Sequence, residues 1–186
     1  MADLTLEEIK TFVQVAHFDL VKVQTLLEAD PRLLNVINPD FNESALGAAS
    51  HVGRRDIAQY LLDKGAPLTI YTAAMMGMKN QVRQFLQDDP SQAQVKGAHG
   101  FTNLFHAALS GDVEIAQLLY DAGSTEGLGS ALHAAIWQDN EPMLRWLLEH
   151  GADVQTKNYQ GKTPLDAATE QQNTAMVTLL KAHGAN

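Results

Sequence analysis

The stretch Gly161-Lys162-Thr163-Pro164-Leu165-Asp166-Ala167-Ala168 decides the fold. Thr163 predicts the start of a helix, because its hydroxyl can accept a hydrogen bond from a free backbone N–H of the first turn. Pro164 suits the first helical position, where its missing N–H costs nothing. Gly184 lies eighteen residues after Asp166 and predicts a helix end, since glycine adopts left-handed dihedrals without steric cost. We therefore expect this segment to fold as helix, tight turn, helix and stop.

Five other segments of the chain align with this one. Each has an anchor residue that is followed eighteen positions later by Gly, or in two segments by Asp30 or Asp89 with a proline after it. Asp is one of the few residues besides Gly that tolerate the backbone angles of a helix end. The six anchors are Phe12, Gly47, Tyr71, Phe105, His133 and Asp166.

Apolar residues recur at helical spacing within each segment, as in Ile115, Leu118 and Leu119. This spacing predicts one buried face on each helix. A helix of about ten residues is too short to persist alone in water, so the segments must stack and share one core. The sequence therefore predicts an all-α solenoid.

The repeated segments resemble a known family. Ser130-Ala131-Leu132-His133-Ala134-Ala135 and the opening stretch resemble the ankyrin signature T-P-L-H-x-A, and Leu147-Leu148-Glu149-His150-Gly151-Ala152-Asp153-Val154 is similar to the usual end of an ankyrin repeat. The resemblance extends over nearly the whole chain. It implies an ankyrin-repeat solenoid of stacked helix-turn-helix pairs, with residues 1–186 as a single domain. We expect the repeats at about 5–31, 42–65, 67–90, 100–123, 129–151 and 161–184.

The spacing of the anchors is irregular. Successive anchors lie 35, 24, 34, 28 and 33 residues apart. In the ankyrin family, the residues between repeats form a β-hairpin finger. The two short spacings therefore predict that the fingers after the second and fourth repeats are short or missing.

Composition narrows the classes of partner and the compartment. The 13 Lys and Arg residues against 22 Asp and Glu residues give a net charge of −9, which disfavours binding to a phosphate backbone. Without cysteine, disulfides and thiolate metal sites are impossible. The start MADLTLEEIK lacks an export signal, and no run approaches the roughly 18 apolar residues of a membrane span. We expect a monomeric cytoplasmic protein that binds neither nucleic acid nor membrane, with the repeats carrying its whole function.

Known catalytic and cofactor motifs are missing from the sequence. We therefore predict no enzymatic activity, no cofactor and no metal. His150 and His183 occupy equivalent places in neighbouring repeats, but such places lie about 8–10 Å apart, whereas ligands of one ion nearly touch. The resemblance implies that His133 is structural and hydrogen-bonds neighbouring backbone.

The resemblance also implies where a partner would bind. In ankyrin repeats the concave surface is lined by the end of the first helix of each pair and by the preceding finger. Large apolar strips with Trp, Tyr and Met are typical of interaction sites. The predicted partner-binding residues are His51, Met75, Met76, Phe101, Leu109, Trp137 and Tyr159. The alternative is that the short fingers let these side chains pack under a neighbouring repeat as ordinary core.

Two functions remain open from the sequence. The first is a protein–protein interaction module of adaptor, scaffold or inhibitor type, which holds a partner protein on its concave face. The second is a small-ligand binder or an enzyme with a site in the irregular central repeats. A module is expected to retain a protein partner in stoichiometric amount, which a ligand binder or enzyme need not do.

Overall fold

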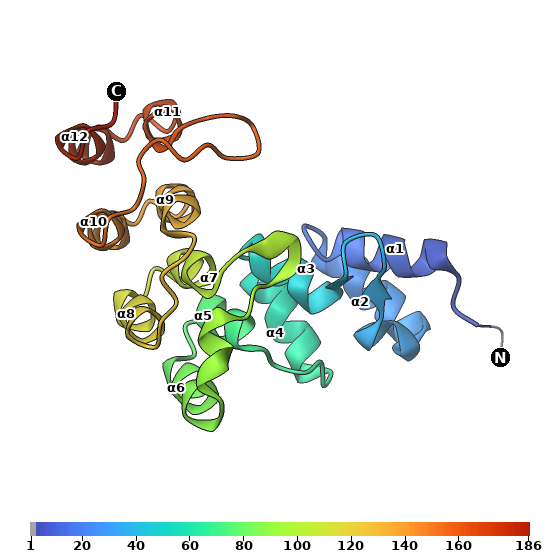
Figure 1. Cartoon of the computed structure of the whole chain (residues 1–186). Helices are drawn as coiled ribbons and strands as arrows, with labels where there is room; N and C mark the ends of the chain where they lie inside the picture. The colour runs from blue at the N-terminus through green and yellow to red at the C-terminus, as the bar shows by residue number, and fades with distance from the viewer. Residues whose placement is uncertain (1–2) are drawn as a thin grey trace.

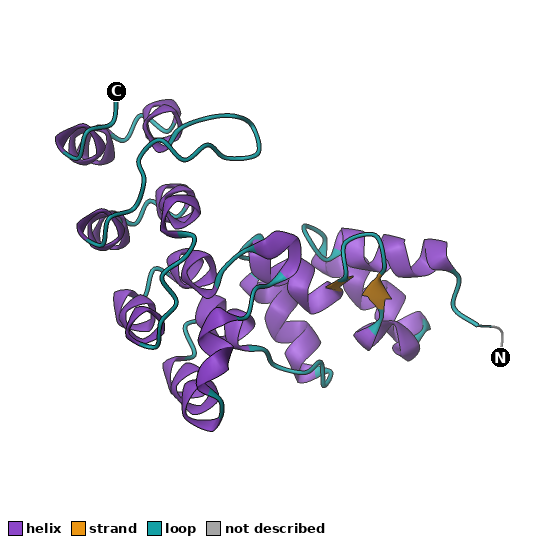
Figure 2. Ribbon diagram, viewed as in Figure 1, coloured by secondary structure: helices purple, strands orange, loops and turns teal. Residues whose placement is uncertain are grey.

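Six consecutive helix pairs make up the part of the chain that the computed structural model describes, residues 3–186 (Figures 1 and 2). The pairs are α1 (Leu6–Val15) with α2 (Leu20–Ala29), α3 (Ala45–His51) with α4 (Arg55–Asp63), α5 (Ile70–Met76) with α6 (Lys79–Asp88), α7 (Asn103–Ser110) with α8 (Val113–Asp121), α9 (Leu128–Trp137) with α10 (Glu141–Glu149), and α11 (Pro164–Glu170) with α12 (Thr174–Ala182). Over these same residues, no helix combines the length and the apolar character needed to cross a bilayer. The predicted all-α solenoid of stacked helix pairs is confirmed.

Hydroxyl side chains begin most of the first helices of the pairs. In α11, Thr163 Oγ1 accepts a hydrogen bond from the Asp166 N–H at 3.2 Å, and the Asp166 carboxylate accepts one from the Thr163 N–H at 2.8 Å. This reciprocal arrangement satisfies two backbone donors that the helix itself cannot. Thr5 forms the same reciprocal cap with Glu8 at α1. At α3, α5 and α7 the hydroxyls of Ser44, Thr69 and Thr102 accept a hydrogen bond from the first turn without the reciprocal bond.

The first helices of the pairs stack into an inner column whose contacts are made largely by alanine. Small side chains allow neighbouring helices to approach closely, which compensates for the shortness of each helix. The completely or almost completely buried alanines of the central helices are Ala73, Ala74, Ala107, Ala108, Ala134 and Ala135. Larger side chains from the second helices, such as Ile57 of α4 and Leu119 of α8, fill the layer between the two columns.

Long and short links alternate along the stack. After α2 the chain forms the 3-10 helix η1 (Pro31–Asn35) and a hairpin of β1 (Ile37–Asn38) and β2 (Glu43–Ser44). After α6 it forms the 3-10 helices η2 (Pro90–Gln94) and η3 (Ala98–Gly100), with a single bridge between Lys96 and Thr102. A third long loop, 153–162, follows α10. The links 64–69 and 122–127 contain no strand, as the short anchor spacings predicted.

The short link 122–127 requires a glycine at its end. Gly127 has φ +75°, and a Cβ there would lie 2.6 Å from Oγ1 of Thr102. The left-handed backbone and the close approach both exclude a side chain. Gly127 thus allows α9 to begin directly beside the start of α7.

Because no finger precedes α5, the next finger lies over that helix. A Cβ at Gly97 would lie 2.9 Å from His106 Cε1 and 3.5 Å from Tyr71 Cδ2, so this finger runs against α5 and α7. Its tip, η3, contacts α3. In Figure 1 the direction of the stack changes near α5: α1–α4 run across the view, while α6–α12 are seen nearly end-on.

Replacing Leu119 tests whether the repeats share one hydrophobic core. It is fully buried on α8, whereas Leu118, which the sequence also placed on the buried face, is only half-buried. We expect Leu119→Ala to lower the free energy of unfolding by about 2–5 kcal/mol and Leu118→Ala to lower it less. Because each repeat touches its neighbours, hydrogen exchange should accelerate in α6 and α10 as well as in α8. Acceleration confined to α8 would contradict a shared core.

His106 of α7 makes stability depend on pH. Burial lowers its pKa to about 4 from an ordinary 6.5, so the folded chain keeps this imidazole neutral while the unfolded chain protonates it. The stabilisation is complete above pH 6.5 and is lost as the pH falls towards 4, by about 3 kcal/mol at most. In His106→Asn, whose amide can still donate to the Thr102 carbonyl as Nδ1 does at 2.9 Å, this part of the pH dependence should disappear. The measurement is the free energy of unfolding of the parent and of His106→Asn, obtained with urea between pH 4 and 7. If the two free energies change with pH in parallel, the assignment to His106 is wrong.

Candidate functional site

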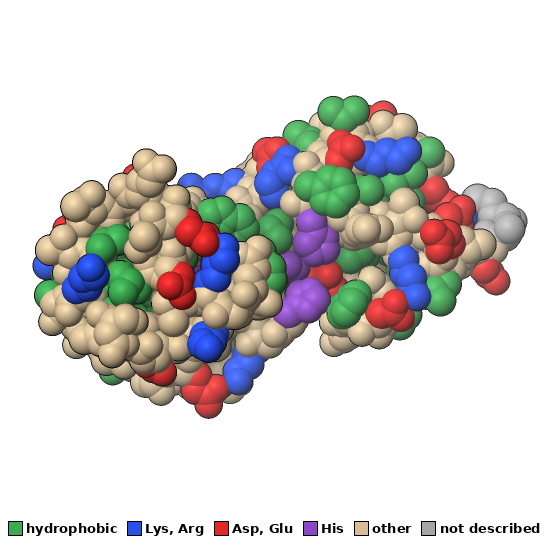
Figure 3. Space-filling model, turned by 90° about the horizontal axis from the view of Figure 1, so that it is seen from above, with side chains coloured by type: hydrophobic (Ala, Val, Ile, Leu, Met, Phe, Trp, Pro, Cys, Tyr) green, Lys and Arg blue, Asp and Glu red, His purple; other side chains and the backbone are tan. Residues whose placement is uncertain are grey.

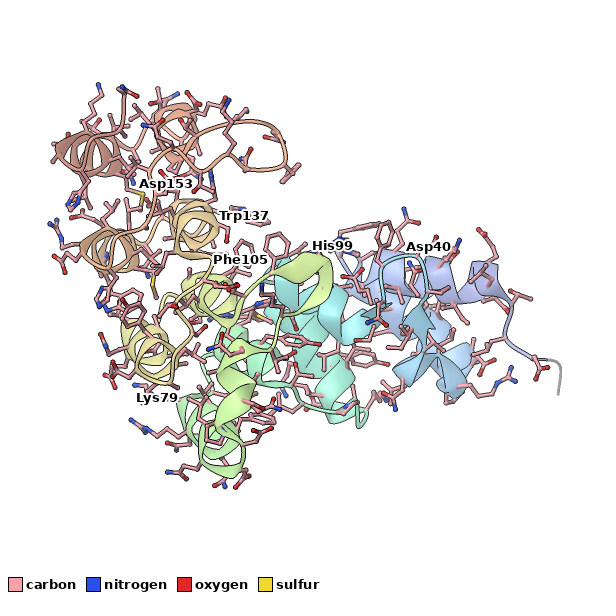
Figure 4. All side chains as sticks on the ribbon, in the orientation of Figure 1. Asp40, Lys79, His99, Phe105, Trp137 and Asp153 are labelled. Atoms are coloured by element: carbon pink, nitrogen blue, oxygen red, sulfur yellow. The ribbon has the colours of Figure 1, made fainter. Side chains whose placement is uncertain are left out.

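A groove of about 650 Å³ lies on the open side of the inner column. Its walls come from the end of α3, one face of α9, the start of α7 with the residue Phe101 before it, the face of α11 and the finger 153–162. Trp137, the last residue of α9, lines the groove with 57% of its surface exposed. Figure 4 shows Trp137 and Phe105 facing the same open side of the column. The groove is thus a concave surface shared by four repeats.

Four of the predicted partner-binding residues line this groove together: His51, Phe101, Trp137 and Tyr159. Their exposure differs, because Tyr159 at the tip of its finger is 93% exposed whereas His51 is 9% exposed. The structure thus brings four of the seven predicted residues together on one concave surface. Contact with a partner at these residues remains a prediction.

The other three predicted residues do not line the groove. Met75 is 0% exposed and Leu109 is 2% exposed, while Met76 is half-buried against the core. The expectation of an exposed strip at Met75 and Leu109 is wrong. The physical reason is the close stacking of α3, α5 and α7 on their alanines, which leaves the position four residues after the anchor packed inside the column. The core alternative is the correct one for these two side chains.

The floor of the groove is aromatic and its outer edge carries cations. Phe101 stacks on Phe105 with ring centroids 4.0 Å apart, and His51 stacks on Phe101 at 5.8 Å. Lys157 and Lys162 lie on the finger that forms the outer edge, and Lys162 pairs with Glu170 of α11 at 2.6 Å. The arrangement offers flat apolar surface for side chains and positive charge for an acidic group.

His133 fixes that finger to α9. Its Nε2–H donates to the Thr156 carbonyl at 2.8 Å, and desolvation lowers its pKa. The lowered pKa favours the neutral imidazole, which connects α9 to the finger through this hydrogen bond, as the resemblance implied for His133. His150 is also used in packing, because its ring stacks on Trp146 at 4.0 Å and its Nδ1 lies 2.7 Å from the Trp146 carbonyl.

A second group of side chains lies at the end of the groove nearest α3. The cluster contains His17 of the turn after α1, Glu43 of β2, His51 of α3 and His99 of η3. Their ring nitrogens and carboxylate oxygens lie within 4.8 Å of one another. His51 belongs to both this cluster and the groove. We refer to these four residues as the histidine cluster.

No metal ligands were predicted from the sequence, and this cluster was not foreseen. The axes of neighbouring helices lie about 8–10 Å apart, whereas the rings of His17 and His51 converge to 4.9 Å between centroids. The signal present in the sequence was that His17 and His51 stand five and four residues after their anchors, where the first helices of adjacent repeats end. The contribution of His99 depends on a finger that lies over α5, which no spacing revealed.

Comparison with known proteins agrees with the architecture. Residues 120–186 match the family model for ankyrin repeats in three copies. The chain is 28% identical over 128 residues to Ankyrin repeat and SAM domain-containing protein 6 of Mus musculus, covering 60% of this chain and 14% of that protein. It is 26% identical over 196 residues to the Nuclear factor NF-kappa-B p105 subunit of Gallus gallus, covering 94% and 20%. With the RelA-associated inhibitor of Mus musculus, it is 31% identical over 116 residues, covering 59% and 14%.

The chain spans a fifth or less of the length of each of these relatives. The likeness thus concerns a repeat region within larger proteins. Six stacked helix pairs, the signature around His133 and the matching family model agree with one another. The chain is therefore a member of the ankyrin-repeat family.

Proposed function

We propose that the chain is a protein-binding module that holds an extended segment or a helix of a partner protein in the groove between α3 and α11. Ankyrin repeats generally mediate protein–protein interaction and are generally not enzymes. One relative carries the name of an inhibitor, the RelA-associated inhibitor. An adaptor, scaffold or inhibitor role for this chain is part of the same proposal.

The observation that carries the proposal is the exposed Trp137 at the centre of an aromatic groove. An unpaired tryptophan with 57% of its surface in water costs hydrophobic free energy that a partner side chain would recover. Tryptophan and tyrosine are enriched among the residues that dominate binding energy. Lys157 on the facing finger favours a partner segment with an acidic side chain near its apolar anchors.

The small-ligand alternative also has an observation in its favour. A groove of about 650 Å³ falls within the range of about 300–1,000 Å³ that is usual for small-molecule sites. Such sites enclose most of the ligand, however, whereas this groove is bordered by the nearly fully exposed Tyr159. A groove that is open at its border can accept part of a longer polypeptide whose two ends continue into solvent. This favours a protein segment over a small molecule.

Trp137→Ala tests the groove. We expect the variant to lose at least about 2 kcal/mol of binding free energy, roughly thirtyfold in affinity, because a central aromatic anchor is removed. Its thermal midpoint should stay close to that of the parent, since an exposed side chain contributes little to folding. The measurements are thermal unfolding and the affinity for a partner isolated from the native cell.

The matched control is Phe18→Ala. Phe18 is an aromatic residue with 60% exposure that is not part of the groove lining. It should leave the affinity unchanged. A Trp137→Ala variant with parental stability and parental affinity would exclude the groove as the binding surface, and a large loss of stability would assign Trp137 to the core instead.

A further inference from the structure

We propose that the histidine cluster is a binding site for one divalent transition-metal ion, with His17, His51 and His99 as nitrogen ligands and Glu43 as the oxygen ligand. Figure 3 shows histidine side chains gathered at the middle of the molecule, with an acidic side chain among them. The four residues come from two helix pairs and two fingers, far apart in sequence.

The distances within the cluster are those expected around an ion. Glu43 Oε1 lies 3.0 Å from His51 Nδ1 and 3.7 Å from His99 Nε2, and Glu43 Oε2 lies 3.7 Å from His17 Nε2. Ligands at about 2.0–2.1 Å from a tetrahedral ion are about 3.3 Å from one another. Small side-chain rotations would therefore bring all four atoms into one coordination sphere.

Two buried atoms of the cluster are in ion-pair contact but make no hydrogen bond. The Glu43 side chain is 2% exposed and that of His51 is 10% exposed. Oε1 of Glu43 and Nδ1 of His51 face each other, yet neither has a hydrogen-bond partner. A buried carboxylate oxygen without a hydrogen bond is unfavourable. A cation shared between these two atoms would remove that cost.

The other two histidines are oriented as ligands. His17 Nδ1 lies 3.0 Å from the Gln14 carbonyl and 3.2 Å from the Val13 carbonyl. Because carbonyl oxygens only accept, Nδ1 carries a proton, and in the neutral ring Nε2 then has a lone pair on the side facing Glu43. Metal-bound histidines are typically oriented by such a hydrogen bond on the other ring nitrogen. His99 is held at φ 56° in η3, and its Nε2 points back towards Glu43.

The ligand set indicates the class of ion. Three imidazoles and one carboxylate suit borderline ions such as Zn²⁺, Fe²⁺, Co²⁺ and Ni²⁺, whereas Mg²⁺ and Ca²⁺ prefer oxygen. The side chains of His17 and His99 are 27% and 37% exposed, so an ion can enter from solvent. Because His51 also lines the groove, the ion would lie at one end of it.

The test uses the full chain without a histidine tag, stripped of metal by a chelator, and titrated with Zn²⁺ against a competing chromophoric chelator. We expect one ion per chain. Glu43→Gln, which keeps the size of the side chain and removes its charge, should weaken the affinity at least tenfold. His99→Asn should do the same, and it is a surface change whose left-handed backbone Asn tolerates. His183→Asn, at an exposed histidine outside the cluster, is the matched control and should bind as the parent does.

Co²⁺ provides a second readout, because its visible absorption intensifies strongly on four-coordinate binding. That absorption should appear in the parent and in His183→Asn and be lost in His99→Asn, while circular dichroism of the metal-free proteins stays the same. The proposal is overturned if Zn²⁺ does not bind, or if all four proteins bind it equally. The cluster would then be an ion pair between Glu43 and protonated histidine. His99→Asn decides the question alone if Glu43→Gln does not fold.

Discussion

Contact between the alanine faces of successive inner helices is the constraint on which the structure depends. The helices contain seven to ten residues, too few to be stable alone, so each exists only because its neighbours cover it. Alanines such as Ala74 and Ala108 keep α5, α7 and α9 close together. The groove and the histidine cluster both follow from this close packing of the inner helices. It determines which side chains remain outside the column and how far the fingers extend over it.

Much of the fold could be predicted because its signals are local. Thr163 and Gly184 act within one helix pair, where a cap and a left-handed end require particular residue types. The missing fingers could be predicted from anchor spacing alone, since a link of six residues cannot form a hairpin across a repeat. The burial of individual side chains was harder to predict. Leu118 and Leu119 are equally apolar, and only the rotation of α8 against its neighbours places Leu119 inside the core.

The candidate site could be predicted only in part because it depends on side chains from distant repeats. Trp137, predicted from the register of the first helices, and Tyr159, predicted from the finger, both line the groove. The same register misplaced Met75 and Leu109, whose position is exposed at Trp137 but buried where the column is tightly stacked. The histidine cluster lay outside prediction, since its geometry depends on a finger crossing a repeat that has none of its own.

The alternation of long and short links means that the natural unit of exchange is two helix pairs. The order helix pair, Asp-Pro with a 3-10 helix, finger, helix pair and short link occurs twice, beginning at α1 and again at α5. Deleting or inserting one pair would set two fingers or two short links side by side and disturb the spacing of the column. A block such as 70–127 instead begins and ends at equivalent points of this order. Duplicating such a block, in evolution or by design, would lengthen the array without altering its existing junctions.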